Sequence, residues 1–190
     1  MLYLHGNSSS RLECSTIIKY LPRNYALAAF DFIGCGHNHE ADTVSLGVRE
    51  SEQVDTVVKF LKQAGYRVVL WGRSMGGATA IKYGKAPVIV ADSAFSSFRS
   101  LCKQIAHKNA PEYLPGCFIS CFFPCVFCKL KSDVEERAGY DLDELDIVSD
   151  LSRIHPETLM VFMSGDEDTL IDHSNSELLY ESYPGPHKHL

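Results

Sequence analysis

Short apolar runs that alternate with longer stretches of helical periodicity constrain the fold of this 190-residue chain more than any other feature. The runs are Leu2–Leu4, Ala26–Phe32, Arg67–Trp71, Pro87–Ala91 and Thr158–Met163. Between and after them lie the helical stretches Arg11–Leu21, Leu46–Ala64, Met75–Gly84, Ser96–His107 and His173–Tyr183. Strands that are apolar throughout belong to parallel sheets with both faces covered. The sequence therefore predicts an α/β fold, with a mostly parallel sheet of five to six strands and helices on both faces.

Composition narrows the class of protein. Of the residues, 45% are hydrophobic and 22% are charged, which suits one soluble globular domain and excludes a disordered, fibrous or membrane-bundle protein. The net charge is −6 and lysines and arginines form no long cluster, so nucleic acid is not an expected partner. The longest apolar stretch, at 118–127, is shorter than the ~20 residues that a membrane-spanning helix needs. We expect a protein that is at most peripherally bound to a membrane.

The seven cysteines indicate the compartment. Their number is odd and is too small for a disulfide scaffold in a chain of this size. No signal peptide is evident at the amino terminus. We therefore expect free thiols and a cytoplasmic location, with membrane association left open.

A long segment at 109–156 separates the fourth and fifth apolar runs. It begins with prolines and a glycine, continues through a stretch rich in cysteine and phenylalanine, and ends in an acidic part, Ser132–Asp150, that we expect to be helical. An insertion of this length in an α/β sheet usually lies over the ligand-binding edge. We expect one domain over residues 1–190 with a cap-like insertion at about 109–156.

The strongest chemical signal is Gly72-Arg73-Ser74-Met75-Gly76, which follows an apolar run and precedes a helical stretch. A strand that turns directly into a helix strains the residue at the bend and needs glycines two positions before and after it. The hydroxyl of Ser74 would then project beyond the sheet, at a helix amino terminus that favours developing negative charge. The alternative is a glycine-rich turn with an incidental serine. The flanking pattern favours a nucleophile.

A second signal lies in the first apolar run, which ends in His5-Gly6-Asn7. A backbone N–H of this turn, with Asn7 as the first choice, and the N–H of Met75 would form an oxyanion hole beside Ser74. His5 is expected to brace the turn. The alternative is a plain turn followed by a serine that caps the next helix. Together with the turn at Ser74, the oxyanion hole is the favoured interpretation.

Acidic residues follow the last apolar run, in Gly165-Asp166-Glu167-Asp168. In a parallel sheet this position lies at the same edge as Ser74. We expect Asp168 to orient and stabilise a catalytic histidine. The two acidic residues before it are nearby alternatives, and Asp92 at the end of the fourth run is a weaker one. The non-catalytic interpretation is an acidic helix cap.

These motifs, in this order along nearly the whole chain, resemble the α/β-hydrolase superfamily, and most closely its serine-peptidase-like and protein-depalmitoylating branch. The turn at 31–36 belongs to the resemblance. The resemblance implies a serine hydrolase in which Ser74 attacks an ester, thioester or amide carbonyl and Asp168 holds the base. It implies no metal and no organic cofactor. The nucleophile turn is specific to the fold and not to a substrate, so acyl-chain preference and oligomeric state stay open.

The sequence departs from the family at its histidine, which follows one further strand after the acid. After the helical stretch that begins at His173 and a turn, only the first residues of such a strand remain. His187 and His189 would lie at the opposite edge of the sheet, about 16 Å away by strand length, whereas a general base must come within ~3.2 Å of the hydroxyl. The remaining histidines near the correct edge are expected to be solvated: His37, His39 and His173.

The first strands of the family pattern are also missing before Met1. We therefore expect a fragment of a longer hydrolase, with its histidine beyond Leu190 and with impaired or absent activity of its own. The alternative function, of a different class, is a non-catalytic binding or scaffold protein that keeps the fold without the base.

Cys117, Cys121, Cys125 and Cys128 have spacings that would line one face of a continuous helix. Pro124 is expected to disturb that helix, and zinc ligands usually come as two short pairs with a longer spacer, so a metal site is not favoured. The favoured interpretation is that these small side chains pack a cap against the sheet. The other is an apolar lid that contacts acyl chains or a membrane, with lipid-modified thiols.

Overall fold

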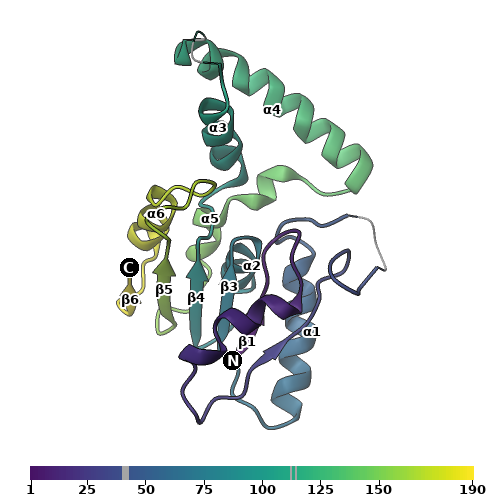
Figure 1. Ribbon diagram of the computed structural model, residues 1–190, viewed down its shortest axis with the longest axis vertical. Coiled ribbons are helices and arrows are strands. Elements are labelled where there is room, and N and C mark those ends of the chain that lie inside the picture. The colour runs from purple at the N-terminus through teal and green to yellow at the C-terminus, as the bar shows by residue number, and fades with distance from the viewer. Residues whose placement is uncertain (40–42, 112, 114) are drawn as a thin grey trace.

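The computed structural model describes residues 1–39, 43–111, 113 and 115–190 and contains a six-stranded sheet. The strands are β1 (Leu2–Leu4), β2 (Ala28–Ala29), β3 (Leu70–Arg73), β4 (Val88–Asp92), β5 (Leu159–Met163) and β6 (Lys188–His189). They lie in the order β2-β1-β3-β4-β5-β6, and every neighbouring pair is parallel (Figure 1). The predicted α/β fold with a parallel sheet is confirmed.

Six α-helices and three short 3-10 helices accompany the sheet in the described residues. The α-helices are α1 (Glu50–Gln63), α2 (Met75–Tyr83), α3 (Phe98–Lys108), α4 (Gly116–Ala138), α5 (Ile147–Leu151) and α6 (Ser174–Ser182). The 3-10 helices are η1 (Arg11–Thr16), η2 (Ile18–Tyr20) and η3 (Leu142–Leu145). Helix α2 contacts α1, α5 and the central strands, and α5 contacts α6, so these four helices form one layer on one face of the sheet.

The two faces of the sheet are covered unequally. The side chains that point toward the α-helical layer are at most 1% exposed, and they are Leu2, Leu4, Leu70, Ile89, Ala91, Met160 and Phe162. On the other face η1 covers β1 and β2. Over β3 to β5 that face is only partly covered, because its apolar side chains are half-buried or exposed at Trp71, Val88, Leu159, Val161 and Met163. The core therefore lies between the sheet and the α-helical layer.

The chain between β1 and β2 differs from the prediction. The stretch Arg11–Leu21 forms η1 and η2 in place of an α-helix. Its side chains are held by distant partners, since Arg11 pairs with Asp31 and Glu13 pairs with Arg73. Such tertiary contacts override a helical pattern in the sequence.

Strand β2 is also shorter than the predicted strand Ala26–Phe32. It pairs with β1 over only two residues, at Leu2↔Ala28 and Tyr3↔Ala29. From Asp31 onward the chain turns, because the Asp31 carboxylate accepts hydrogen bonds from the backbone N–H groups of Arg11 and His37. The edge strand therefore ends early.

The segment 109–156 contains one long helix that the sequence did not predict. Helix α4 runs without interruption through Pro124, so the expected disturbance was wrong. Pro124 has no N–H to donate to the Ser120 carbonyl. Both residues are exposed, so water can solvate that carbonyl. The predicted helix at Ser132–Asp150 divides at Gly139, where a left-handed backbone (φ 69°) ends α4 before η3 and α5.

The prediction that the cysteines of this segment pack against the sheet was wrong. All four lie on α4 and are exposed: Cys117, Cys121, Cys125 and Cys128. Helix α4 packs against α3 and η3. The described residues contain no group of three or more His, Cys, Asp or Glu side chains that could hold a metal ion. The position of these thiols therefore needs another explanation.

Candidate active site

Ser74 lies at the bend between β3 and α2, where the sequence predicts it. Its backbone is left-handed (φ 53°, ψ −116°), and its N–H donates to the Asp92 carbonyl at the end of β4 (2.8 Å). A Cβ on Gly72 would lie 2.1 Å from the Gly76 carbonyl oxygen, and a Cβ on Gly76 would lie 2.0 Å from the carbonyl oxygen of Leu4. Only glycine fits at either position, so the spacing of the motif follows from the close approach of α2 to β1 and β3. The Ser74 side chain is partly exposed.

The turn after β1 lies beside the amino terminus of α2. Gly76 packs against the carbonyl oxygens of Leu4 and His5, two to three residues before Asn7. Asn7 is exposed and its Oδ1 accepts a hydrogen bond from the Ser8 N–H (2.9 Å). Met75 is the first residue of α2, so helix geometry provides no partner within the helix for its N–H. Both predicted oxyanion donors are therefore at the same end of α2.

His5 is fully buried and holds the turn after β1 in place through hydrogen bonds and packing. Its Nε2 accepts a hydrogen bond from the Phe32 N–H (3.2 Å), so the proton lies on Nδ1, which donates to the Gly6 carbonyl (2.8 Å). The ring also packs against Phe32, with centroids 4.9 Å apart. These contacts agree with the expected bracing role and leave the ring without a free nitrogen for catalysis.

A partly exposed ion pair that sequence reasoning missed links this turn to the nucleophile strand. Glu13 on η1 receives two hydrogen bonds from the Arg73 guanidinium (2.8 and 2.9 Å) and one from the Tyr3 hydroxyl (2.7 Å). The Gly6 N–H also faces both Glu13 oxygens at 3.4 Å. Arg73 is the residue before Ser74, so one carboxylate connects the oxyanion turn to the nucleophile. The sequence offered no signal for it, because Glu13 reads only as an acidic residue early in a helix.

This ion pair predicts a loss of stability in acid. Burial alone would raise the pKa of Glu13, but hydrogen bonds from Arg73, Ser9 and Tyr3 outweigh it and lower the pKa from 4.5 to about 2. A carboxyl with a lowered pKa stabilises the fold above its unfolded pKa, and this stability is lost as the pH falls toward the folded pKa. We expect the free energy of unfolding to fall by about 1 kcal/mol more in the wild type than in Glu13→Gln between pH 5.5 and pH 3, because solvent around the half-exposed Arg73 weakens the pair.

Urea unfolding of both proteins at the two pH values measures this difference. The glutamine variant is the matched control, because it keeps every other titrating carboxyl and a similar side-chain shape. Equal losses in the two proteins would contradict the assignment of the effect to Glu13.

Asp168 follows β5, and its environment keeps it ionised. Burial acts to raise the pKa of Asp168, but the backbone N–H groups of Ile171 and Leu170, the Ser93 hydroxyl and the charge of Arg73 together lower it. The Asp168 Oδ1 accepts both backbone bonds, at 3.0 Å from Ile171 and 2.9 Å from Leu170. Asp168 therefore lies within the electrostatic range of the residue that precedes Ser74.

The strand ends explain why Ser74 and Asp168 lie at the same edge. In the sheet Arg73 pairs with Asp92, and Asp92 pairs with Met163. Ser93 repeats the geometry of Ser74 one strand further on, with a left-handed backbone (φ 49°) and an N–H that donates to the Met163 carbonyl (2.7 Å). Asp92 itself has a raised pKa because of burial, although Trp71, Arg73 and Ser93 act to lower it. A carboxyl of this kind is a poorer partner for a histidine cation than Asp168 is.

The profile of the alpha/beta hydrolase family matches residues 1–118, more than half of the chain. The chain belongs to the α/β-hydrolase family. A search of curated proteins found no significant match.

Solved structures described as esterases and lipases are similar to this chain over nearly its whole length. The esterase Pf2001 of Pyrococcus furiosus superimposes with a TM-score of 0.68 at 22% identity and covers 100% of this chain and 70% of that chain. A bacterial membrane phospholipase A gives a TM-score of 0.64 at 18% identity, with 98% and 69% coverage. Est816, described as an N-acyl homoserine lactone degrading enzyme, gives 0.65 at 17% identity, with 99% and 82% coverage. At these identities the likeness shows the fold alone.

No histidine ring of this α/β hydrolase forms a hydrogen bond with the Ser74 hydroxyl within the described residues. His189 on β6 pairs with Val161 on β5. Through β4 this places His189 at the level of Trp71 on β3, three strands away. Three residues along the strands and three strand spacings across the sheet separate it from Ser74 by roughly 17 Å. His173 lies at the correct edge but bonds to Ser164, with its Nδ1 2.5 Å from the hydroxyl oxygen.

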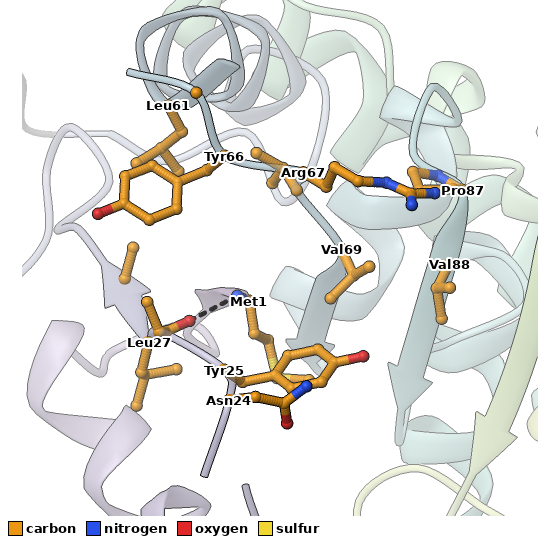
Figure 2. Close-up of a pocket in the computed structure, with 14 residues that line it drawn as sticks. Met1, Asn24, Tyr25, Leu27, Leu61, Tyr66, Arg67, Val69, Pro87 and Val88 are labelled. Atoms are coloured by element: carbon orange, nitrogen blue, oxygen red, sulfur yellow. Dashed lines mark hydrogen bonds between the residues drawn. The ribbon is translucent and has the colours of Figure 1, made fainter. Parts of the chain in front are cut away.

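Two cavities border the sheet of this α/β hydrolase at opposite ends. One, of about 530 Å³, lies between α3 and the loop after β5 and is lined by Asp168, Leu170, Lys103 and His107 among others. The larger one, of about 670 Å³, lies at the amino ends of the strands and is lined by residues that include Met1, Tyr25, Tyr66, Arg67, Val69 and Val88 (Figure 2). Only the smaller cavity adjoins a candidate catalytic residue.

Proposed function

We propose that the chain is a serine hydrolase of esters, thioesters or amides with Ser74 as the nucleophile. The observation that carries this proposal is the strained turn at Ser74, which holds this partly exposed residue at the amino terminus of α2. Strain of this kind costs of order 1–3 kcal/mol and is kept where it has a use. The hydroxyl oxygen would attack the carbonyl carbon of the substrate while a base takes its proton, and that proton would pass to the alcohol, thiol or amine as it leaves. Water would then hydrolyse the acyl ester of Ser74, which releases the carboxylic acid and restores the hydroxyl.

We propose the N–H groups of Met75 and Asn7 as the oxyanion hole. The amino terminus of α2 carries partial positive charge, so it would stabilise the oxyanion of the tetrahedral intermediate. The bracing of the turn by His5 and by Glu13 supports this role, because a donor stabilises a transition state best when it is fixed in advance.

Asp168 is proposed as the carboxylate that orients a histidine base. Its lowered pKa and its place near Arg73 and Ser93 support it over Asp92, whose pKa is raised. No histidine contacts Ser74 in the described residues, so we propose that these 190 residues alone hydrolyse their substrate slowly. A base that reached Ser74 from outside them would complete the site.

The substrate class draws support from the similar structures. Two of them are described as an esterase and a membrane phospholipase A, and both act on carboxylic esters by those names. We propose a carboxylic ester or thioester with an apolar acyl chain for this protein, and a peripheral contact of the segment 109–156 with a membrane.

Labelling with a fluorophosphonate probe tests the nucleophile. We expect slow labelling of the 190-residue chain, a clear increase when free imidazole is added as a substitute base, and a single modified residue, Ser74, by mass spectrometry. Ser74→Ala should abolish labelling, whereas Ser164→Ala, which removes a neighbouring serine at the same edge, should leave it unchanged. Labelling at another serine, or none even with imidazole, would refute the proposal.

The second candidate function is a non-catalytic binding protein with the hydrolase fold. The lack of a histidine contact at Ser74 in the described residues favours it. This function predicts that the probe does not label Ser74 even with imidazole, although circular dichroism shows an intact fold.

A further inference from the structure

The first half of α4 presents an apolar face to the solvent. From Gly116 to Cys128 the helix contains no charged residue. Its inward side is fixed by Phe123 and Phe127, which are buried and stacked with centroids 5.6 Å apart. Arg99 of α3 lies over the Phe127 ring at 5.3 Å, so the helix is firmly seated on α3.

The outward side of the same turns carries large exposed hydrophobic groups. Phe118 is 52% exposed, Phe122 is 61% exposed and Val126 is 65% exposed. The two phenylalanine rings stack with centroids 6.4 Å apart. The four exposed cysteines lie beside them on this side. We call these seven residues the Cys/Phe face; they are Cys117, Phe118, Cys121, Phe122, Cys125, Val126 and Cys128.

The charge around the Cys/Phe face is opposite to that of the rest of the chain. Residues 97–138, which include α3 and α4, contain six lysines and arginines and four acidic residues, a net charge of +2, whereas the whole chain carries −6. Lys129 and Lys131 pair with nearby aspartates, and Lys108 donates to the Thr169 carbonyl. Helix α3, against which α4 packs, has no acidic residue and contributes Arg99, over the Phe127 ring, and Lys103, at the cavity that contains Asp168. Such a patch attracts an anionic surface.

The Cys/Phe face lies beyond the catalytic edge of the sheet. In Figure 1 the strands end toward α3, which rises from β4, and α4 lies beyond α3. Helix α3 also lines the cavity that contains Asp168. A surface that contacted α4 would therefore be close to the site where an ester is cleaved.

We propose that the Cys/Phe face binds the surface of an anionic phospholipid bilayer. The inference rests on the proposed function in one respect: binding would bring an acyl ester of the bilayer to Ser74. Binding itself does not need Ser74. No helix of the described residues is long and apolar enough to cross a membrane, so α4 would lie in the interface. A lipid surface fits better than a protein partner, because the face has no charged group and its neighbouring hydroxyl, that of Ser120, is engaged by His107 (3.3 Å).

Sedimentation of the full 190-residue chain with vesicles tests this proposal. We expect binding to vesicles of phosphatidylcholine with phosphatidylserine, weaker binding to phosphatidylcholine alone, and release by salt. The double variant Phe118→Ser/Phe122→Ser should lower the partition constant by at least about tenfold, because two exposed aromatic groups no longer enter the interface. Phe60→Ser is the matched control, since Phe60 on α1 is 68% exposed, and it should bind as the wild type does.

Thiol labelling provides a second readout that does not depend on activity. Anionic vesicles should protect Cys121 and Cys125 from a water-soluble maleimide while Cys14, on η1, reacts as before. Absence of vesicle binding by a folded wild-type chain would overturn the proposal. So would protection that rises with protein concentration in the absence of lipid, because that result identifies a second copy of the chain as the occupant. Vesicle binding without probe labelling of Ser74 would refute the proposed hydrolase and leave the lipid surface standing.

Discussion

Gly76→Ala is expected to destabilise the fold by about 4 kcal/mol or to prevent folding altogether. The new Cβ would lie 2.0 Å from the carbonyl oxygen of Leu4 and 2.9 Å from that of His5. Both are backbone atoms of β1 and of the turn after it, so no side-chain rotation can relieve the contact. Alanine gains about 1 kcal/mol in helix propensity over glycine, which offsets only part of this cost.

Gly165→Ala is the control for this substitution. No atom lies within 4 Å of a Cβ placed on Gly165, and its φ is not left-handed. We expect a change of at most about 0.5 kcal/mol in the free energy of unfolding, measured by urea titration. A similar stability of the two variants would show that the bend at Ser74 does not need the close approach of α2 to β1.

Phe162→Ala is expected to cost about 4 kcal/mol, whereas Val161→Ala on the same strand should cost about 1 kcal/mol. Phe162 is 1% exposed, points into the α-helical layer and meets the Tyr180 ring edge-on with centroids 6.3 Å apart. Val161 points to the opposite face and is only half-buried. The comparison therefore measures directly how unequally the two faces of the sheet contribute to stability.

Urea unfolding of both variants makes this measurement. Nearly equal losses would indicate that the face with Val161 is packed against a part of the protein that protects it as well as α6 protects Phe162. The slope of the transition should stay unchanged, since neither substitution alters the surface exposed on unfolding by much.

Much of the fold could be predicted because a strand buried on both faces is apolar over consecutive residues. The runs at Arg67–Trp71, Pro87–Ala91 and Thr158–Met163 became β3, β4 and β5 within two or three residues at each end. These central strands have neighbours on both sides, so their sequences must be apolar throughout. The edge strand β2 has one neighbouring strand and only two paired residues. Most of the apolar run Ala26–Phe32 therefore forms no strand, and its apolar character reflects side-chain packing more than strand pairing.

The candidate site divides in the same way. The turn at Ser74 could be predicted because the required glycines are adjacent in sequence to the serine. The Glu13–Arg73 pair joins residues 60 positions apart, and only the fold brings them together. The roles of Ser74, Asp168, Asn7 and Met75 remain predictions, and the labelling experiment tests that of Ser74.

The segment around α4 was the least predictable part. Its sequence has the composition of a buried element, and the natural inference was packing against the sheet. The structure instead supports α4 along one narrow side, through Phe123 and Phe127, and leaves the other apolar side open. Hydrophobicity in a sequence predicts burial, but it does not say whether protein or another phase provides the cover.

The serines at the ends of β3 and β4 have a consequence for how the active site assembles. Each has a left-handed backbone, and each N–H is held by the carbonyl at the end of the next strand, Asp92 for Ser74 and Met163 for Ser93. The nucleophile thus takes its shape only when β4 is docked, and Ser93, which faces Asp168, only when β5 is docked. Chemical reactivity at Ser74 should consequently appear late in refolding, as a property of the assembled sheet edge and of no shorter piece of the chain.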